Sequence, residues 1–189
     1  EAYLCTGDEK YGIAGAILTD RVADVYPSFD LTKTSLAYNN SHGGGDSGKI
    51  IGSIWENFTA QAFIECYDAF YPLFDNERVI EFLSRKAEEL NLDNPKTNGN
   101  LIRENIENGI LREVIDGLYT AKIYGNFGFH QAAMVKAASE LYDVPMALHV
   151  DHCTSFETIL QCIRYGYTSV MIDTAHLPYA ENVEMVKKA

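Results

Sequence analysis

Val144-Pro145-Met146-Ala147-Leu148-His149-Val150-Asp151-His152-Cys153 is the stretch that decides the fold. An apolar run, which predicts a strand over Met146–Val150, ends in an adjacent carboxylate and imidazole, and a helical pattern follows it. Strand ends that lead into helices are where α/β enzymes place their catalytic groups. Asp151 and His152 can therefore supply a proton-transfer group and a metal ligand from one turn.

Strand and helix patterns alternate on both sides of this stretch. The predicted strands are Tyr119–Ile123, Met146–Val150 and Thr168–Ile172. The predicted helices are Gln131–Tyr142, Ser155–Tyr165 with Ser155 as N-cap and Gly166 as terminator, and Ala180–Lys188. This order and spacing predict parallel βαβ units with right-handed crossovers. Residues 119–189 are thus expected to form an α/β unit.

Residues 1–118 predict a separate region that is mixed, mainly helical and of unassigned fold. The small apolar run Gly12–Leu18 is typical of a strand, and Val22–Phe29 alternates loosely until Pro27. Three helices are expected: within Ile50–Phe70, from an N-cap at Asn76 through Leu90, and over Ile102–Leu118, where Gly109 weakens the pattern. Asn91–Asn100 predicts a loop that can separate two domains.

Composition narrows the classes of partner. The chain has 189 residues, 47% hydrophobic, and carries a net charge of −12, which repels phosphate backbones and argues against nucleic-acid binding. No apolar run approaches the roughly 20 residues of a membrane helix. The four cysteines form no CxxC pair and no secretory signal opens the chain, so we expect reduced thiols and a cytoplasmic protein. The start at Glu1 and the end at Ala189, within a helical pattern, suggest a fragment of a longer open frame.

Three stretches resemble one enzyme family, the class II (zinc-dependent) fructose- and tagatose-bisphosphate aldolases. Lys136–Pro145 is similar to the helix and turn before the family's metal strand, and Leu148–His152 resembles its Leu-His-Leu-Asp-His signature. Gly166–Asp173, followed by His176–Val183, resembles the next strand and helix start. Order and spacing agree over residues 119–189, and the resemblance does not extend to residues 1–118.

The resemblance implies a fold and a reaction. It implies part of a TIM (β/α)8 barrel and the cleavage of a ketose bisphosphate to dihydroxyacetone phosphate and an aldehyde, a lyase reaction of glycolysis and carbohydrate metabolism. His152 would bind Zn²⁺, and Asp151 would be the catalytic acid/base at the C4 hydroxyl. Asp173 and His176 would lie near the metal, in its outer sphere. His176 matches the tagatose-type branch, and the alternative for it is a surface role in the loop. The implied partner is a phosphorylated sugar, in a homo-oligomer.

The chain also departs from the family pattern. Thr174-Ala175 replaces the usual Gly-Ser, and Cys153 stands where Gly or His is frequent. In the family, two more zinc histidines and a catalytic glutamate follow the segment that ends here at Ala189, whereas a catalytic zinc normally has three protein ligands. The alternative function is therefore a non-catalytic, incomplete barrel that acts as an interaction module, with exposed strand edges and apolar faces.

Three further residues or motifs have competing interpretations. His149 shares a strand face with Asp151 and is expected to be a hydrogen-bonded core histidine rather than a ligand. Cys153 is expected to be a small buried residue, with metal ligation as the alternative. Gly43–Lys49 fits a phosphate-binding loop, G-x-x-x-x-G-K, but Ile50 replaces the Mg²⁺-binding Ser/Thr, so a surface loop is the preferred interpretation over nucleotide binding.

Overall fold

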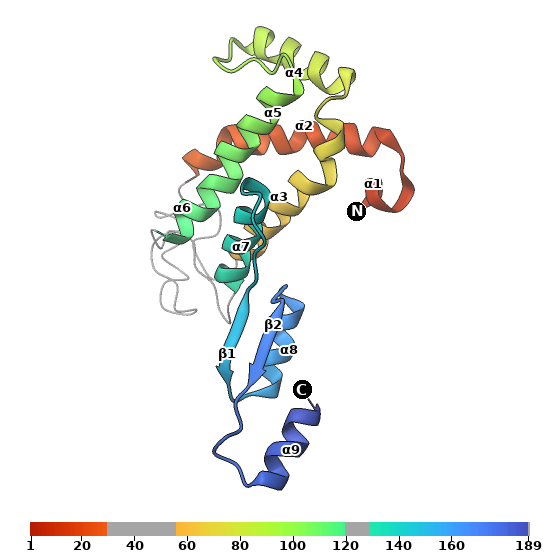
Figure 1. Cartoon of the computed structure of the whole chain (residues 1–189). Helices are drawn as coiled ribbons and strands as arrows, with labels where there is room; N and C mark the ends of the chain where they lie inside the picture. The colour runs from red at the N-terminus through yellow and green to blue at the C-terminus, as the bar shows by residue number, and fades with distance from the viewer. Residues whose placement is uncertain (30–55, 120–128, 189) are drawn as a thin grey trace, which may run out of the picture.

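The computed structural model describes residues 1–29, 56–119 and 129–188. Two regions follow one another along the chain (Figure 1). The helical unit comprises the described residues up to Leu141, and the α/β segment comprises residues 149–188. The Gly43–Lys49 motif and most of the predicted strand Tyr119–Ile123 lie outside the described residues.

Helices alone make up the helical unit within the described residues. In chain order they are α1 Ala2–Thr6, α2 Glu9–Val25, the 3-10 turn η1 Tyr26–Ser28, α3 Glu56–Phe70, the 3-10 turn η3 Tyr71–Leu73, α4 Glu77–Leu90, α5 Gly99–Ile106, the π-helical segment η4 Glu107–Arg112, α6 Glu113–Tyr119 and α7 Phe129–Leu141. The predicted N-cap of α4 is confirmed, because the Asn76 side chain accepts from the Arg78 backbone N–H. Tyr119, predicted to open a strand, is instead the last residue of α6.

The strand predicted over Gly12–Leu18 is wrong, because this run forms the middle of α2. Asp8 caps the helix by accepting from the Lys10 N–H, and the buried residues Ile13, Ala16 and Ala23 recur at helical spacing. The small residues serve close packing instead of a sheet. A Cβ on Gly12 would overlap the Leu73 side chain, and one on Gly15 would overlap the ring of Phe70. The predicted alternation over Val22–Phe29 resolves into the end of α2 and the turn η1.

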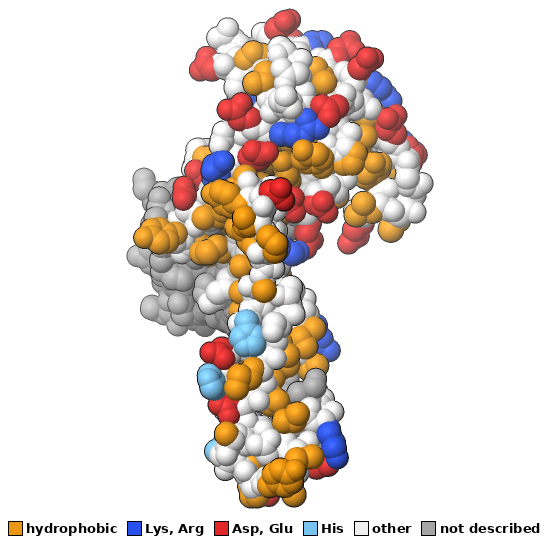
Figure 2. All heavy atoms as spheres, viewed as in Figure 1, with side chains coloured by type: hydrophobic (Ala, Val, Ile, Leu, Met, Phe, Trp, Pro, Cys, Tyr) orange, Lys and Arg blue, Asp and Glu red, His pale blue; other side chains and the backbone are white. Residues whose placement is uncertain are grey.

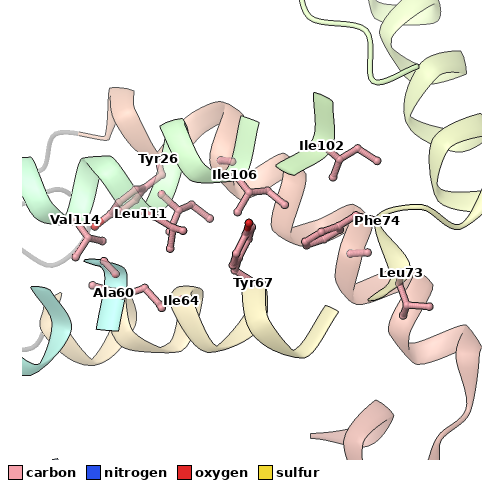
Figure 3. Close-up of a cluster of buried hydrophobic side chains, with 14 of the residues drawn as sticks. Tyr26, Ala60, Ile64, Tyr67, Leu73, Phe74, Ile102, Ile106, Leu111 and Val114 are labelled. Atoms are coloured by element: carbon pink, nitrogen blue, oxygen red, sulfur yellow. The ribbon is translucent and has the colours of Figure 1, made fainter. Parts of the chain in front are cut away.

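The hydrophobic core lies between α2, α3 and the long helix formed by α5, η4 and α6 (Figure 3). Tyr26, Tyr67 and Phe74 contribute aromatic rings to this core, and each is at most 2% exposed. Ile106, Leu111 and Val114 face them from the long helix. Ala133 and Ala137 of α7 belong to the same cluster, so α7 packs with the helical unit. The boundary predicted at 118/119 remains a prediction.

The π-helical segment η4 explains the regular spacing of the long helix. Ile102, Ile106, Ile110 and Val114 are each four residues apart and fully buried. In an α-helix such a row drifts by about 40° per step, because 3.6 residues make one turn. A π turn, which closes i→i+5 bonds, offsets that drift. Gly109 allows η4 to approach α2 closely, because a Cβ at this position would overlap the carbonyl oxygen of Ala23.

A buried cluster of charged and polar side chains connects α2, α5 and the loop before α5. Lys96 Nζ lies 3.3 Å from Asp24 Oδ1 and 3.7 Å from Asp20 Oδ2, with side-chain exposures of 5% for Lys96 and 2% for Asp20. Asn105 donates to Asp20 Oδ1 and Asp24 Oδ1 at 2.9 and 3.0 Å. Burial raises the pKa of Asp20 to about 6, against the opposing charge of Lys96. Burial also acts on Asp24, but hydrogen bonds from Asn94 and the charge of Lys96 leave its pKa below the usual value.

The α/β segment consists of β1 His149–Cys153, α8 Phe156–Arg164, β2 Ser169–Ile172 and α9 Tyr179–Lys188. β1 and β2 pair in parallel, as predicted. Ser155 caps α8 by accepting from the Thr158 N–H, and Gly166 follows its end at φ +93°, also as predicted. β1 begins at His149, later than the Met146 start predicted for it, and continues through Cys153, so Asp151 and His152 lie within the strand.

The fold class is thus α/β in its coarse sense: mainly helical, with one parallel two-stranded sheet among the described residues. A partial (β/α)8 barrel is a finer prediction that two strands do not establish. The four cysteines, all among the described residues, form no disulfide. In the part of the chain that the structure describes, no helix combines the length and the apolar character needed to cross a membrane.

Candidate functional site

A β-bulge in β1 determines where the predicted site residues point. Val150 is paired with Val170 and Cys153 with Ile172, so two residues of β1, Asp151 and His152, oppose one residue of β2. His152 adopts a left-handed backbone conformation, with φ +49°. This conformation costs a non-glycine residue about 1–3 kcal/mol and is concentrated at functional sites. The bulge interrupts the alternation of side chains, which allows His152 and Asp151 to approach each other.

Asp173 orients the imidazole of His152. His152 Nδ1 lies 2.7 Å from Asp173 Oδ2, and Asp173 Oδ1 accepts from the Ala175 N–H at 3.1 Å. A carboxylate at Nδ1 favours the tautomer with the proton on that nitrogen, which leaves the Nε2 lone pair available. Two neighbouring strand ends thus hold one imidazole with a defined ligand atom.

The same contact shifts both pKa values. The hydrogen bond to Asp173, followed by the negative charge of Asp151, raises the pKa of His152. The hydrogen bond from His152, followed by that from the Ala175 backbone, lowers the pKa of Asp173. An imidazole must be neutral to bind a metal. Protonation of His152 would therefore compete with metal binding at this ring.

Asp151 lies between two imidazoles. Its Oδ1 is 3.9 Å from His152 Nε2 and 3.7 Å from His149 Nε2. The side chains of Asp151 and His152 are 68% and 66% exposed, so both are open to a ligand. Figure 2 shows histidine and acidic side chains side by side on one flank of the α/β segment. The two residues predicted as acid/base and metal ligand are therefore neighbours on one surface.

The structure confirms that His149 is hydrogen-bonded, but it does not confirm the predicted burial of this residue. Its Nδ1 lies 2.9 Å from Ser169 Oγ, but its side chain is 43% exposed, so it is not a core residue. Ser169 was not among the predicted site residues. The signal was present in the predicted parallel pairing, because Ser169 is the register partner of His149.

The other candidates lie further from this group. His176 is exposed, and its charge is only the last of the influences that lower the pKa of Asp173. The Cys153 thiol donates to the carbonyl of Ser155 at 3.3 Å. Cys153 is half-buried and not buried as predicted. Thr174, a departure from the family pattern, is buried, and its carbonyl accepts from Asn182 of α9 at 3.0 Å.

The described residues fit a metal only in part. His152 offers an oriented Nε2 with a carboxylate behind it, the arrangement usual for a histidine ligand. Across residues 1–29, 56–119 and 129–188, however, no three or more His, Cys, Asp or Glu side chains are grouped so as to hold a metal ion. The described residues therefore offer His152 as one candidate ligand and no complete coordination sphere.

Comparison with known families identifies the C-terminal part of the chain by its similarity. The family model of class-II fructose-bisphosphate aldolase matches residues 114–189, which confirms the resemblance seen in the sequence. The match begins inside α6 and includes α7 and the whole α/β segment. No solved structure matches the chain. The C-terminal part is thus similar to an aldolase domain, and residues 1–113 lie outside the match.

Proposed function

We propose that the C-terminal part of this chain takes part in zinc-dependent aldol cleavage and condensation of a ketose bisphosphate of the fructose or tagatose type. The observation that carries the proposal is the placement of Asp151 beside an imidazole whose ligand nitrogen is set by Asp173. The family match over residues 114–189 supports the reaction class.

Each residue has a defined task in this proposal. His152 Nε2 would bind the zinc ion, with Asp173 holding the ring, and the other ligands would come from outside the described residues. When bound, the zinc ion would act as a Lewis acid that polarises the substrate's ketone and stabilises negative charge on its oxygen. Asp151 takes the proton from the C4 hydroxyl in cleavage and returns it in condensation. Its exposure gives a substrate hydroxyl room to reach it.

Enzyme assays with matched variants test this proposal. Dihydroxyacetone phosphate release from fructose and tagatose 1,6-bisphosphate is measured on the full chain with added Zn²⁺. Asp151→Asn should lower kcat by at least about 100-fold, the usual scale of a lost general base. Asp143→Asn, an exposed carboxylate outside the site, is the control. His152→Gln should weaken zinc binding measured by calorimetry. Full activity in Asp151→Asn would remove that residue from the reaction.

A second candidate, an interaction module without catalysis, is favoured by one observation: the described residues supply a single oriented ligand rather than three. Exposed apolar side chains of the α/β segment, Met171, Ile163 and Tyr179 among them, agree with a contact surface. Absence of cleavage and of zinc binding, together with self-association in size-exclusion chromatography, would support it. A well-behaved monomer would count against it.

A further inference from the structure

A short polar chain crosses the sheet beside Asp151. Ser169 of β2 and His149 of β1 are register partners, and Ser169 Oγ lies 2.9 Å from His149 Nδ1. On the other side of the ring, His149 Nε2 lies 3.7 Å from Asp151 Oδ1. One imidazole therefore contacts a hydroxyl through one nitrogen and faces a carboxylate through the other.

The hydroxyl can set the tautomer of this ring. A neutral imidazole has one N–H donor and one acceptor, and the partner of one nitrogen decides which is which. When Ser169 donates to Nδ1, the proton of His149 is on Nε2, the nitrogen that faces Asp151. At 3.7 Å the N–H is too far for a hydrogen bond, so its effect on the carboxylate is an electrostatic attraction.

We propose that His149, oriented by Ser169, is a positioning residue that keeps the Asp151 carboxylate in place for proton transfer. This inference rests on the proposed function, because it concerns the reaction that Asp151 would serve. The Asp151 side chain is 68% exposed and is otherwise next to His152 Nε2 at 3.9 Å. Without the N–H of His149 the carboxylate gains other rotamers, and fewer molecules hold it ready to react.

The first experiment needs no activity. Imidazole nitrogen shifts of His149 are measured by NMR on the full chain. The Nε2–H tautomer is expected in the unsubstituted chain and in Ser169→Thr, and a mixture of tautomers in Ser169→Ala. A proton on Nδ1 in the unsubstituted chain, or no change in Ser169→Ala, overturns the proposal.

The second experiment separates turnover from binding. His149→Phe and Ser169→Ala should each lower kcat about 10-fold, the scale seen for outer-sphere partners. KM should stay within about twofold, because Asp151 acts on the transition state rather than on binding. Ser169→Thr, which keeps a hydroxyl, should restore kcat. The control is Ser139→Ala in α7, which should leave kcat unchanged; the Ser139 hydroxyl donates to the Lys136 carbonyl.

The outcomes of the second experiment distinguish the two proposals. If the unsubstituted chain cleaves a ketose bisphosphate and the His149 and Ser169 variants keep its kcat, the positioning role is wrong and the proposed function stands. If the unsubstituted chain with Zn²⁺ cleaves neither substrate, the proposed function is wrong and the positioning role falls with it, whatever tautomer His149 shows.

Discussion

The helical unit and the α/β segment differ in how many of their side chains are buried. Every residue of the hydrophobic core cluster belongs to the helical unit, and so does the buried group of Lys96, Asp20 and Asp24. In the α/β segment α9 has no buried residue, and the candidate site is on an exposed strand. Since a two-stranded sheet is at best marginally stable alone, the helical unit should carry most of the free energy of unfolding, while the α/β segment carries the candidate site.

Removing the buried cation should give the largest effect on stability. Lys96→Met leaves Asp20 and Asp24 without their positive partner, and breaking a buried ion pair costs about 3–5 kcal/mol. The free energy of unfolding is measured by urea denaturation followed by circular dichroism. Lys86→Met, which removes an exposed lysine that pairs with Glu89, should change it by less than about 0.5 kcal/mol. Equal losses in both variants would show that burial does not set the cost of removing the Lys96 cation.

Truncation of apolar side chains compares the two regions directly. Ile106 is fully buried, so Ile106→Ala should lower the free energy of unfolding by about 2–5 kcal/mol. Ile163 of α8 is 46% exposed, and Ile163→Ala should change it by about 0.5 kcal/mol or less. Denaturant midpoints at fixed m-value report the difference. A larger loss at Ile163 would show that the α/β segment is buried against something in solution.

The pH dependence of stability should come from the helical unit. The pKa of Asp20 rises from 3.8 to about 6 on folding, so the folded state holds this proton more tightly. Stability from this group is full below about pH 4 and is lost as pH rises through 6, by up to about 3 kcal/mol. The lowered pKa of Asp24 acts in the opposite direction at lower pH. Asp20→Asn should flatten the decline in thermal midpoint between pH 4 and 7. An unchanged slope would mean that another titratable group causes this pH dependence.

The smallest effect on stability is expected at the candidate site. Asp173→Asn removes the carboxylate that hydrogen-bonds His152, so the pKa of His152 should move back down toward its usual value. NMR titration of the His152 ring measures this shift. The thermal midpoint should change little, because the His152 side chain is exposed and that of Asp173 is only half-buried. A substantial loss of stability would mean that the pair supports the fold rather than the chemistry.

Local signals in the sequence predicted the elements that begin or end with a strong cap. Asn76, Ser155 and Gly166 each mark a helix boundary through their own backbone or side-chain chemistry, and the structure has all three. The run Gly12–Leu18 was misread because glycine and alanine suit close helix packing as well as a buried strand. Its true partners, Phe70 and Leu73, are more than 50 residues away in the chain.

The candidate site was predictable in its members but not in its geometry. The Asp-His pair follows from the motif, yet strict alternation along a strand would separate Asp151 and His152 onto opposite faces. Their proximity depends on the bulge opposite Met171, which results from the pairing of β1 with β2. Ser169 was missed for the same reason, since its relevance comes from register and not from its own neighbours in the sequence.

The π turn and the β-bulge each contain one residue more than a regular helix or strand would have at that point. At both places the structure therefore depends on the number of residues as well as on their types. Deleting one residue from Glu107–Arg112 would convert the π turn to α-helical winding and remove the four-residue spacing between buried residues of the long helix at that point. Deleting one from Asp151-His152 would straighten β1 and leave a single side chain opposite Met171. Homologous or designed sequences should therefore tolerate substitutions at these two places more readily than gaps.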